Sequence, residues 1–305
     1  MRTSTTSVTA ETDLTVASSR SRVSDFKELL KPGISAFVVV TSITGYLLGI
    51  SGGIDWGVLV GLMVGTGLTA GGAGTLNHLA ERKHDALMER TKDRPLPSGR
   101  MSPGLAFAYG TLLLVVGTIV LFVATNLLTA GLAVVTALLY VLLYTPLKRV
   151  TAFNTLVGAI PGALPILGGY TAATGTFGAI GWAVFAILFL WQLPHFYSLA
   201  WMLRDDYEKG GFVMLPSLDP TGRSTAFHAF VATGLLAVAG LVPTLIGAAG
   251  WIYLFGMSLL GIAFLFPALA FLRERTYDKA RQLMFASIVY VPVFFALVVI
   301  DFLLR

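Results

Sequence analysis

Long stretches without a charged residue dominate this chain. Three of them contain no Asp, Glu, Lys or Arg, and they cover residues 101–147, 150–203 and 224–272. Each is about two membrane crossings long, because one crossing needs roughly 20 apolar residues. Turn-like residues interrupt the stretches near Thr125-Asn126, Thr174-Gly175 and residues 247–250. The pattern therefore predicts three pairs of membrane-spanning helices.

Apolar segments at both ends of the chain add three more spans. Residues 33–50 and 56–79 form a fourth pair, and a ninth helix covers about residues 283–304. Inside a bilayer every backbone polar group needs an internal partner, which a helix provides. We therefore predict an all-α, polytopic membrane protein of about nine transmembrane helices.

Composition agrees with this class and removes several kinds of chemistry. Of the 305 residues, 55% are hydrophobic and only 12% are charged, which lies outside the usual balance of soluble domains. The chain has no cysteine. Disulfides, thiolate nucleophiles, iron–sulfur clusters and cysteine-type zinc sites are therefore excluded.

The basic residues predict how the chain is oriented. With nine spans and a cytoplasmic N-terminus, 20 of the 21 lysines and arginines fall on the cytoplasmic side, as the positive-inside rule requires. The net charge of +5 then reflects topology, and nucleic-acid binding is not expected. We expect a multi-pass protein of a bacterial or archaeal cell membrane.

The first residues have a different composition. Residues 1–24 are rich in Ser, Thr and Arg and lack an apolar core of signal-peptide length, so we expect a disordered cytoplasmic tail. A mitochondrial transit peptide is the alternative, and Glu11 and Asp13 argue against it. Residues 25–305 are expected to form a single transmembrane domain.

Polar groups concentrate at the end of the second predicted span. If that helix continues past Leu79, then Asn77, Glu81 and Asp85 lie four residues apart on one face. Carboxylate and amide oxygens suit Mg²⁺, which proteins usually hold with one or two carboxylates together with substrate phosphates. A solvated loop with local ion pairs is the alternative. Asn77 argues against it, because an amide inside a span is costly unless it has a function.

A second polar segment follows the sixth predicted span. His195, Ser198, Met202 and Asp206 lie at i, i+3, i+7 and i+11, so one continuous helix would place the imidazole and the carboxylate on the same face. Asp205 is a further acidic residue there. A packed, hydrogen-bonded core histidine is the alternative for His195, and Pro194 can kink the helix.

A third cluster lies between the fourth and fifth predicted spans. Tyr144 and Thr145 lead into Lys148 and Arg149. These two cations act by default as topology signals. Alternatively, they hold an anion on the same side of the membrane as both acidic segments.

Two acidic helix ends with basic neighbours suit a substrate that has a diphosphate head and a greasy tail. Over roughly residues 26–304 the chain resembles the UbiA-type intramembrane prenyltransferases, and within them the branch that modifies haem. The motifs that carry the resemblance are Leu30-Lys31-Pro32, the stripe from Asn77 to Asp85, Glu89-Arg90-Thr91, Asp93-Arg94-Pro95-Leu96-Pro97, Tyr144-Thr145-Pro146-Leu147-Lys148-Arg149, Pro194-His195-Phe196, Asp206-Tyr207, Gly210-Gly211 and Met214-Leu215-Pro216.

The resemblance implies transfer of a farnesyl group from farnesyl diphosphate to the vinyl group of haem b, with Mg²⁺ as cofactor and pyrophosphate as the leaving group. The implied metal and catalytic residues are Asn77, Glu81, Asp85 and Asp206, with Asp205 as a further metal ligand. The implied diphosphate-binding residues are Arg90, Arg94, Lys148 and Arg149. The implied haem and prenyl contacts are His195, Tyr144, Phe196 and Tyr197. A haem A synthase or an oxidase assembly protein is the implied partner.

Two positions depart from the wider superfamily. Its first motif commonly has Asp where this chain has Glu81, and its second commonly has a further Asp where this chain has Met202. Three alternatives stay open at this point. They are a prenyltransferase that acts on an aromatic ring, a secondary transporter and a non-catalytic haem-binding assembly subunit. A transporter would place its ionisable groups near the middle of the membrane rather than at helix ends.

Overall fold

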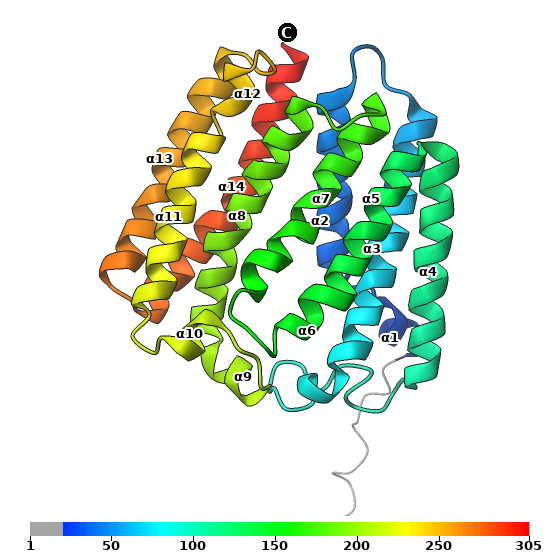
Figure 1. The fold of residues 1–305 in the computed structure, drawn as a ribbon, viewed down its shortest axis with the longest axis vertical. Helices are drawn as coiled ribbons and strands as arrows, with labels where there is room; N and C mark the ends of the chain where they lie inside the picture. Colours follow the sequence, from blue (N-terminus) through cyan, green and yellow to red (C-terminus); the bar gives the residue numbers. More distant parts are fainter. Residues whose placement is uncertain (1–20, 305) are drawn as a thin grey trace, which may run out of the picture.

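A computed structural model describes residues 21–304 of the chain, and within this range all regular structure is helical (Figure 1). Nine of its helices are long and apolar enough to cross a membrane. They are α2 (Pro32–Gly49), α3 (Trp56–Asp85), α4 (Pro103–Ala124), the continuous α5 (Leu127–Leu138), η1 (Leu139–Tyr144) and α6 (Thr145–Leu147), α7 (Asn154–Thr174), α8 (Ala179–Met202), α11 (Arg223–Ala239) continued by α12 (Val242–Leu245), α13 (Trp251–Arg273) and α14 (Tyr277–Leu303). Shorter helices are α1 (Arg22–Leu29), α9 (Arg204–Lys209) and α10 (Leu215–Leu218). The predicted all-α class and the number of spans are confirmed.

The predicted turns coincide with local capping interactions. Asn126 is the N-cap residue of α5, and its side chain accepts a hydrogen bond from the backbone N–H of Thr129. Gly175 ends α7 with a φ of 70°, a left-handed conformation that glycine adopts without steric cost. The last span begins earlier than predicted. Thr276 caps it, and its first turns carry Asp278 and two basic residues that interrupt the apolar pattern.

The predicted cytoplasmic tail, residues 1–24, lies almost wholly outside the described residues. Its last residues, 22–24, form the start of α1, where the hydroxyl of Ser21 accepts a hydrogen bond from the N–H of Ser24. Asp25 in α1 is buried and pairs with Arg100 at 2.9 Å. This ion pair fastens α1 to the segment that follows α3.

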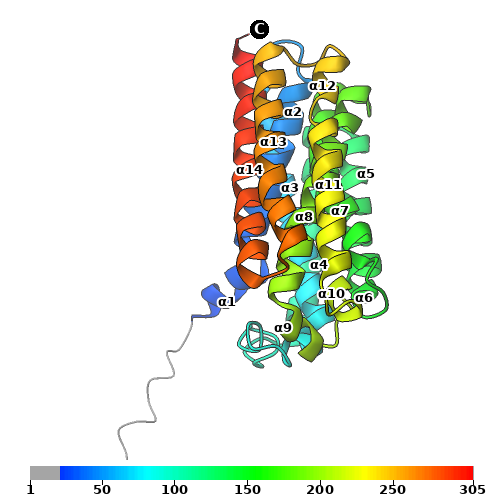
Figure 2. The same cartoon turned by 90° about the vertical axis from the view of Figure 1, so that its left-hand side faces the viewer.

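The helices form two neighbouring groups that meet along α2, α7 and α8. On one side α3, α4 and α5 pack together. On the other side α11 and α14 pack against α8, and α13 packs against α11 and α14 (Figure 1). Turned by 90°, the long helices run roughly in one direction, and α1 lies at their lower end (Figure 2). We call this lower end the mouth. It is formed by residues 86–100, residues 148–153 and helices α9 and α10.

Small residues allow the helices around the centre to approach closely. A Cβ added at Gly169 of α7 would collide with the backbone oxygen of Ser42 in α2, and one added at Gly45 would collide with the backbone oxygen of Ile166 in α7. Contacts of this kind replace the hydrophobic effect as the source of helix association in a bilayer. The α2–α7 pair therefore forms a closely packed wall beside the cavity described below.

Candidate active site

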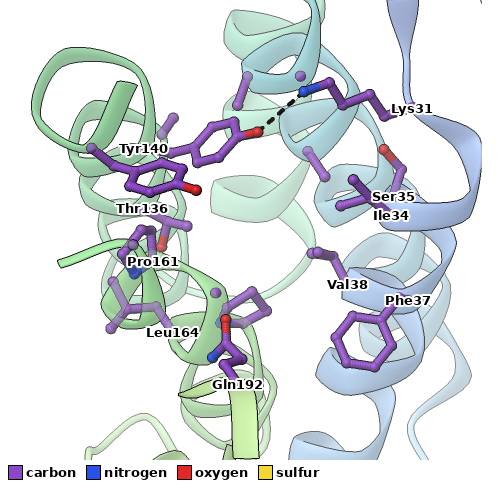
Figure 3. Close-up of a pocket in the computed structure, with 18 of the residues that line it drawn as sticks. Lys31, Ile34, Ser35, Phe37, Val38, Thr136, Tyr140, Pro161, Leu164 and Gln192 are labelled. Atoms are coloured by element: carbon purple, nitrogen blue, oxygen red, sulfur yellow. Dashed lines mark hydrogen bonds between the residues drawn. The ribbon is translucent and has the colours of Figure 1, made fainter. Parts of the chain in front are cut away.

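A cavity of about 530 Å³ opens between α2, α3, α5, η1, α7 and α8. Its volume lies in the range of ligand-binding pockets. Lys31 and Tyr140 lie at one end of the close-up and Phe37 and Gln192 at the other, with apolar side chains such as Val38 and Leu164 between them (Figure 3). The cavity thus combines a charged region with an apolar interior.

Helix α3 continues past Leu79 to Asp85, so the predicted stripe exists and its three members are buried. Each of its oxygen-bearing side chains accepts a hydrogen bond from a basic residue on a different element. The three pairs are Lys31 Nζ to Asn77 Oδ1 at 2.6 Å, Lys148 Nζ to Glu81 Oε1 at 2.7 Å and Arg94 Nη1 to Asp85 Oδ2 at 2.8 Å. Glu81, Asp85 and the three basic side chains line the cavity, whereas Asn77 is fully buried behind them.

This donor set fits a magnesium ion that is bound together with a phosphate. Two carboxylates and one amide oxygen lie on one helix face, and the remaining ligands would come from substrate and water, as is usual for Mg²⁺. Among residues 21–304 there is no cluster of three or more His, Cys, Asp or Glu side chains that could hold a metal alone. The stripe itself provides two carboxylates and one amide oxygen.

Lys31 is the functional residue that the sequence reasoning did not assign. It precedes α2 with a φ of 50°, a left-handed conformation that a residue with a Cβ rarely adopts. This backbone directs its side chain into the cavity, where Nζ also lies 3.3 Å from the hydroxyl of Tyr140. Burial lowers the pKa of Lys31 to about 7, although the Glu81 carboxylate opposes the shift. In the sequence, Lys31 belongs to the Leu30-Lys31-Pro32 motif directly before the first span, but the motif does not show that its side chain enters the cavity.

A wide π-helical turn, η1, presents two tyrosines to the cavity. Tyr140 and Tyr144 stack with their ring centroids 5.7 Å apart, and the ammonium of Lys148 lies 4.6 Å from the Tyr144 centroid. Burial alone would lower the pKa of Lys148, but Tyr144 and Glu81 raise it well above its usual range, so this side chain stays charged. Such π-turns occur frequently at functional sites. Here the turn places both aromatic faces beside the cations.

Helix α8 contributes His195 and Phe196, which both line the cavity. His195 Nδ1 lies 2.8 Å from Ser287 Oγ of α14, and its ring stacks on Trp191 with a centroid separation of 5.5 Å. Tyr197 is buried on another side of α8, where its ring contacts His228 rather than the cavity.

The acidic residues after α8 lie differently from the prediction. Met202 ends α8 and Leu203 breaks the helix, so the expectation of one continuous helix from His195 to Asp206 is wrong. Asp206 Oδ1 instead accepts a hydrogen bond from the backbone N–H of Glu89 at 3.0 Å, and Oδ2 lies 4.0 Å from Arg90 Nε. Asp206 therefore joins α9 to residues 86–100.

Of three further predicted residues, Arg90 lines the cavity, and Arg149 and Asp205 do not. Arg149 reaches His84 at 3.3 Å on the exposed side of the mouth. The side chain of Asp205 is 83% exposed and pairs with Arg204. The structure thus brings together the α3 stripe, Arg90, Arg94 and Lys148. It does not bring Asp205, Asp206 or Arg149 to the cavity wall.

Comparison with known proteins now decides the family. Residues 38–296 match the UbiA prenyltransferase family, which is more than half of the chain. The chain belongs to the UbiA prenyltransferase family. This UbiA-family chain is 50% identical over 280 residues to the protoheme IX farnesyltransferase of Salinibacter ruber, covering 92% of this chain and 99% of that protein. It is 42% identical to the protoheme IX farnesyltransferase of Solibacter usitatus, with 91% and 98% covered.

Solved structures of UbiA-family members share the fold. A digeranylgeranylglyceryl phosphate synthase superposes with a TM-score of 0.79 at 17% identity, covering 93% of this chain and 99% of that chain. A UbiA homologue from Archaeoglobus fulgidus bound to DMAPP and Mg²⁺ superposes with a TM-score of 0.69 at 17% identity, covering 90% and 99%. The predicted UbiA-type bundle is confirmed. This chain is a multi-pass membrane enzyme of the prenyltransferase class, not a transporter or a non-catalytic assembly subunit.

Proposed function

We propose that this chain transfers the farnesyl group of farnesyl diphosphate to a vinyl group of haem b, giving haem O and pyrophosphate. One observation carries the proposal. A single cavity combines buried oxygen acceptors and cations at the mouth with a histidine among aromatic rings on α8. The relatives named protoheme IX farnesyltransferase support it, because they match over more than nine-tenths of this chain and of their own length.

The α3 stripe is proposed to hold the diphosphate through Mg²⁺. Glu81 and Asp85, with the amide oxygen of Asn77, would bind the ion, which supplies positive charge that stabilises the leaving diphosphate. The UbiA homologue from Archaeoglobus fulgidus has been solved with GPP and Mg²⁺. When the carboxylates take up a cation, Lys148 and Arg94 are released from them and can donate to phosphate oxygens.

The remaining basic residues complete the anion site. Lys31 has an amide and a phenol as partners rather than a carboxylate, so it contributes positive charge that no nearby acid pairs directly. Arg90 lines the cavity from the mouth, and Asp206 holds Arg90 and the backbone of Glu89. Asp206 is therefore proposed to position residues 86–100, and its direct contact with metal stays a prediction.

The chemical step needs a dry space for a carbocation. The allylic carbon–oxygen bond breaks with its electron pair going to the diphosphate, and the farnesyl cation then adds to the terminal carbon of the vinyl group. Water adds to the resulting cation beside the macrocycle and loses a proton, which gives the hydroxyethylfarnesyl substituent. The faces of Tyr140, Tyr144 and Phe196 line this space and can stabilise the cation.

The orientation and partners are part of the same proposal. The positive-inside rule places the mouth and the N-terminus in the cytoplasm of a bacterial or archaeal cell. Farnesyl diphosphate would then enter from the cytoplasm with its tail in the bilayer. A haem A synthase or an oxidase assembly protein would receive the product.

Product analysis tests the proposal. Purified protein is incubated with haem b, farnesyl diphosphate and Mg²⁺, and the haem is examined by mass spectrometry. We expect conversion to the mass of the hydroxyethylfarnesyl product. Asp85→Asn should reduce the rate by roughly 10²–10³-fold, the usual effect of removing one group that stabilises a developing anion. Asp278→Asn, at an exposed residue of α14, is the control and should behave as wild type. Recovery of unmodified haem b from the wild-type reaction would refute the proposal.

A further inference from the structure

Ser287 of α14 contacts two residues of the cavity wall at once. Its backbone oxygen accepts a hydrogen bond from Trp191 Nε1 at 2.8 Å, and its Oγ lies 2.8 Å from His195 Nδ1. Ser287 is fully buried, and the farnesyl transfer proposed above assigns it no role. Helix α14 packs directly against α8 (Figure 1), so this contact joins the two helices beside the cavity.

The positions of the hydrogen atoms follow from the proton count of the serine. Its hydroxyl has one proton, and Oγ lies 2.5 Å from the backbone oxygen of Met284. A carbonyl oxygen can only accept, so the hydroxyl donates to Met284. Nδ1 of His195 must then supply the proton of the other bond and donate to Ser287 Oγ.

A neutral imidazole carries one N–H, so Nε2 of His195 is left with a lone pair. No residue in the described range 21–304 makes a hydrogen bond to this nitrogen, and His195 lines the cavity. The ring plane is fixed as well, because Trp191 stacks on it and Phe196 meets it edge-on with a centroid distance of 5.5 Å. A fixed plane and an unused lone pair are what a metal ligand requires.

The other histidines do not offer this arrangement. His84 approaches Gly210 O through Nδ1 and Arg149 through Nε2. His78 and His228 do not line the cavity. His195 is therefore the histidine that can ligate an iron atom bound in the cavity.

We infer that Ser287 is a positioning residue that holds His195 in the Nδ1–H tautomer, so that Nε2 ligates the iron of the haem substrate. The inference rests on the proposed function, and it specifies how haem b is bound. Histidines that bind metal usually donate their other ring N–H to an acceptor, which fixes the ring and raises the basicity of the ligating nitrogen. Ligation would fix the macrocycle against α8 while a vinyl group meets the prenyl cation.

Haem binding in the absence of farnesyl diphosphate tests the inference. Wild-type protein with ferrous haem b should show an iron–histidine stretching band in its resonance Raman spectrum. His195→Ala should lose the band, and added imidazole should restore axial ligation. Ser287→Ala should keep haem bound, shift the band to lower frequency and weaken haem affinity by roughly 10–100-fold, the usual effect of losing such an acceptor.

Ser258→Ala is the matched control. Ser258 lies in α13, is not part of the cavity wall, and its hydroxyl makes a similar bond to Leu254 O at 2.8 Å. It should leave the band and the affinity unchanged. An iron–histidine band that persists in His195→Ala, or a wild-type frequency and affinity in Ser287→Ala, would overturn the inference. Product formation without this band would refute the ligation alone, whereas ligation without product would refute the proposed transfer alone.

Discussion

The Glu81–Lys148 pair provides a prediction that separates stability from activity. The two side chains lie 2.7 Å apart and are only 7% and 14% exposed, so removing one partner leaves a buried charge. Breaking such a pair typically costs about 3–5 kcal/mol. Glu81→Gln should reach this range, because it removes the carboxylate that pairs with Lys148. Lys148, Lys31 and Arg94 then lie close together, and Asp85, which already pairs with Arg94, is the carboxylate of the stripe that remains. Lys148→Met should cost less, since Lys31 still attracts the Glu81 carboxylate.

The double variant Glu81→Gln/Lys148→Met removes both charges and should recover most of the lost stability. For a chain of this size, 1 kcal/mol corresponds to about 2 °C in the midpoint of thermal unfolding, so Glu81→Gln should unfold on the order of 6–10 °C below wild type. The assay is tryptophan fluorescence of the detergent-solubilised protein during heating, together with a product assay. All three variants should lose farnesyl transfer. The reasoning is refuted if the double variant is no more stable than Glu81→Gln, or if it retains wild-type activity.

Three further predictions concern other parts of the site. In wild type, affinity for farnesyl diphosphate should fall by up to about tenfold per pH unit as pH rises above about 7, because Lys31 loses its proton there. Lys31→Arg keeps its charge over this pH range, so its affinity should lack this part of the pH dependence in binding titrations. Ionisation of the diphosphate itself affects both proteins equally and cannot cause a difference between them. Gly158→Ala would force its Cβ into the ring of Tyr144, so it should lower stability by about 1–3 kcal/mol in thermal unfolding and slow transfer. Asp206→Asn should weaken diphosphate binding, because it loses the contact with the backbone of Glu89. Asp205→Asn should change diphosphate affinity and stability by no more than about 0.5 kcal/mol, because its side chain is exposed. Equal losses of diphosphate affinity in the two variants, measured by calorimetry, would contradict these placements.

Features that depend on neighbouring residues were predictable from the sequence. The number of spans follows from charge-free stretches of membrane length, and the helix ends at Asn126 and Gly175 follow from local capping. The stripe of Asn77, Glu81 and Asp85 follows from the helical repeat alone. These three residues needed only the continuation of one helix to become neighbours.

Features that depend on distant residues were not predictable. Lys31 meets Asn77 across 46 residues and Tyr140 across 109, and Ser287 meets His195 across 92. No spacing rule connects such positions. The helix break at Leu203 was missed because neither glycine nor proline marks it, and the tertiary contact of Asp206 with Glu89 replaces the continuous helix there. Adjacent acids such as Asp205 and Asp206 cannot be told apart before the turn of α9 is known.

The central claim is that the α3 stripe binds the metal–diphosphate while the basic side chains move from carboxylate to phosphate. The most direct measurement is an anomalous difference map of crystals grown with Mn²⁺ and a non-hydrolysable farnesyl thiodiphosphate. We predict a manganese peak between the carboxylates of Glu81 and Asp85, with Lys148 and Arg94 turned toward the phosphate oxygens. A diphosphate bound elsewhere, with Lys148 still paired to Glu81, would contradict the claim.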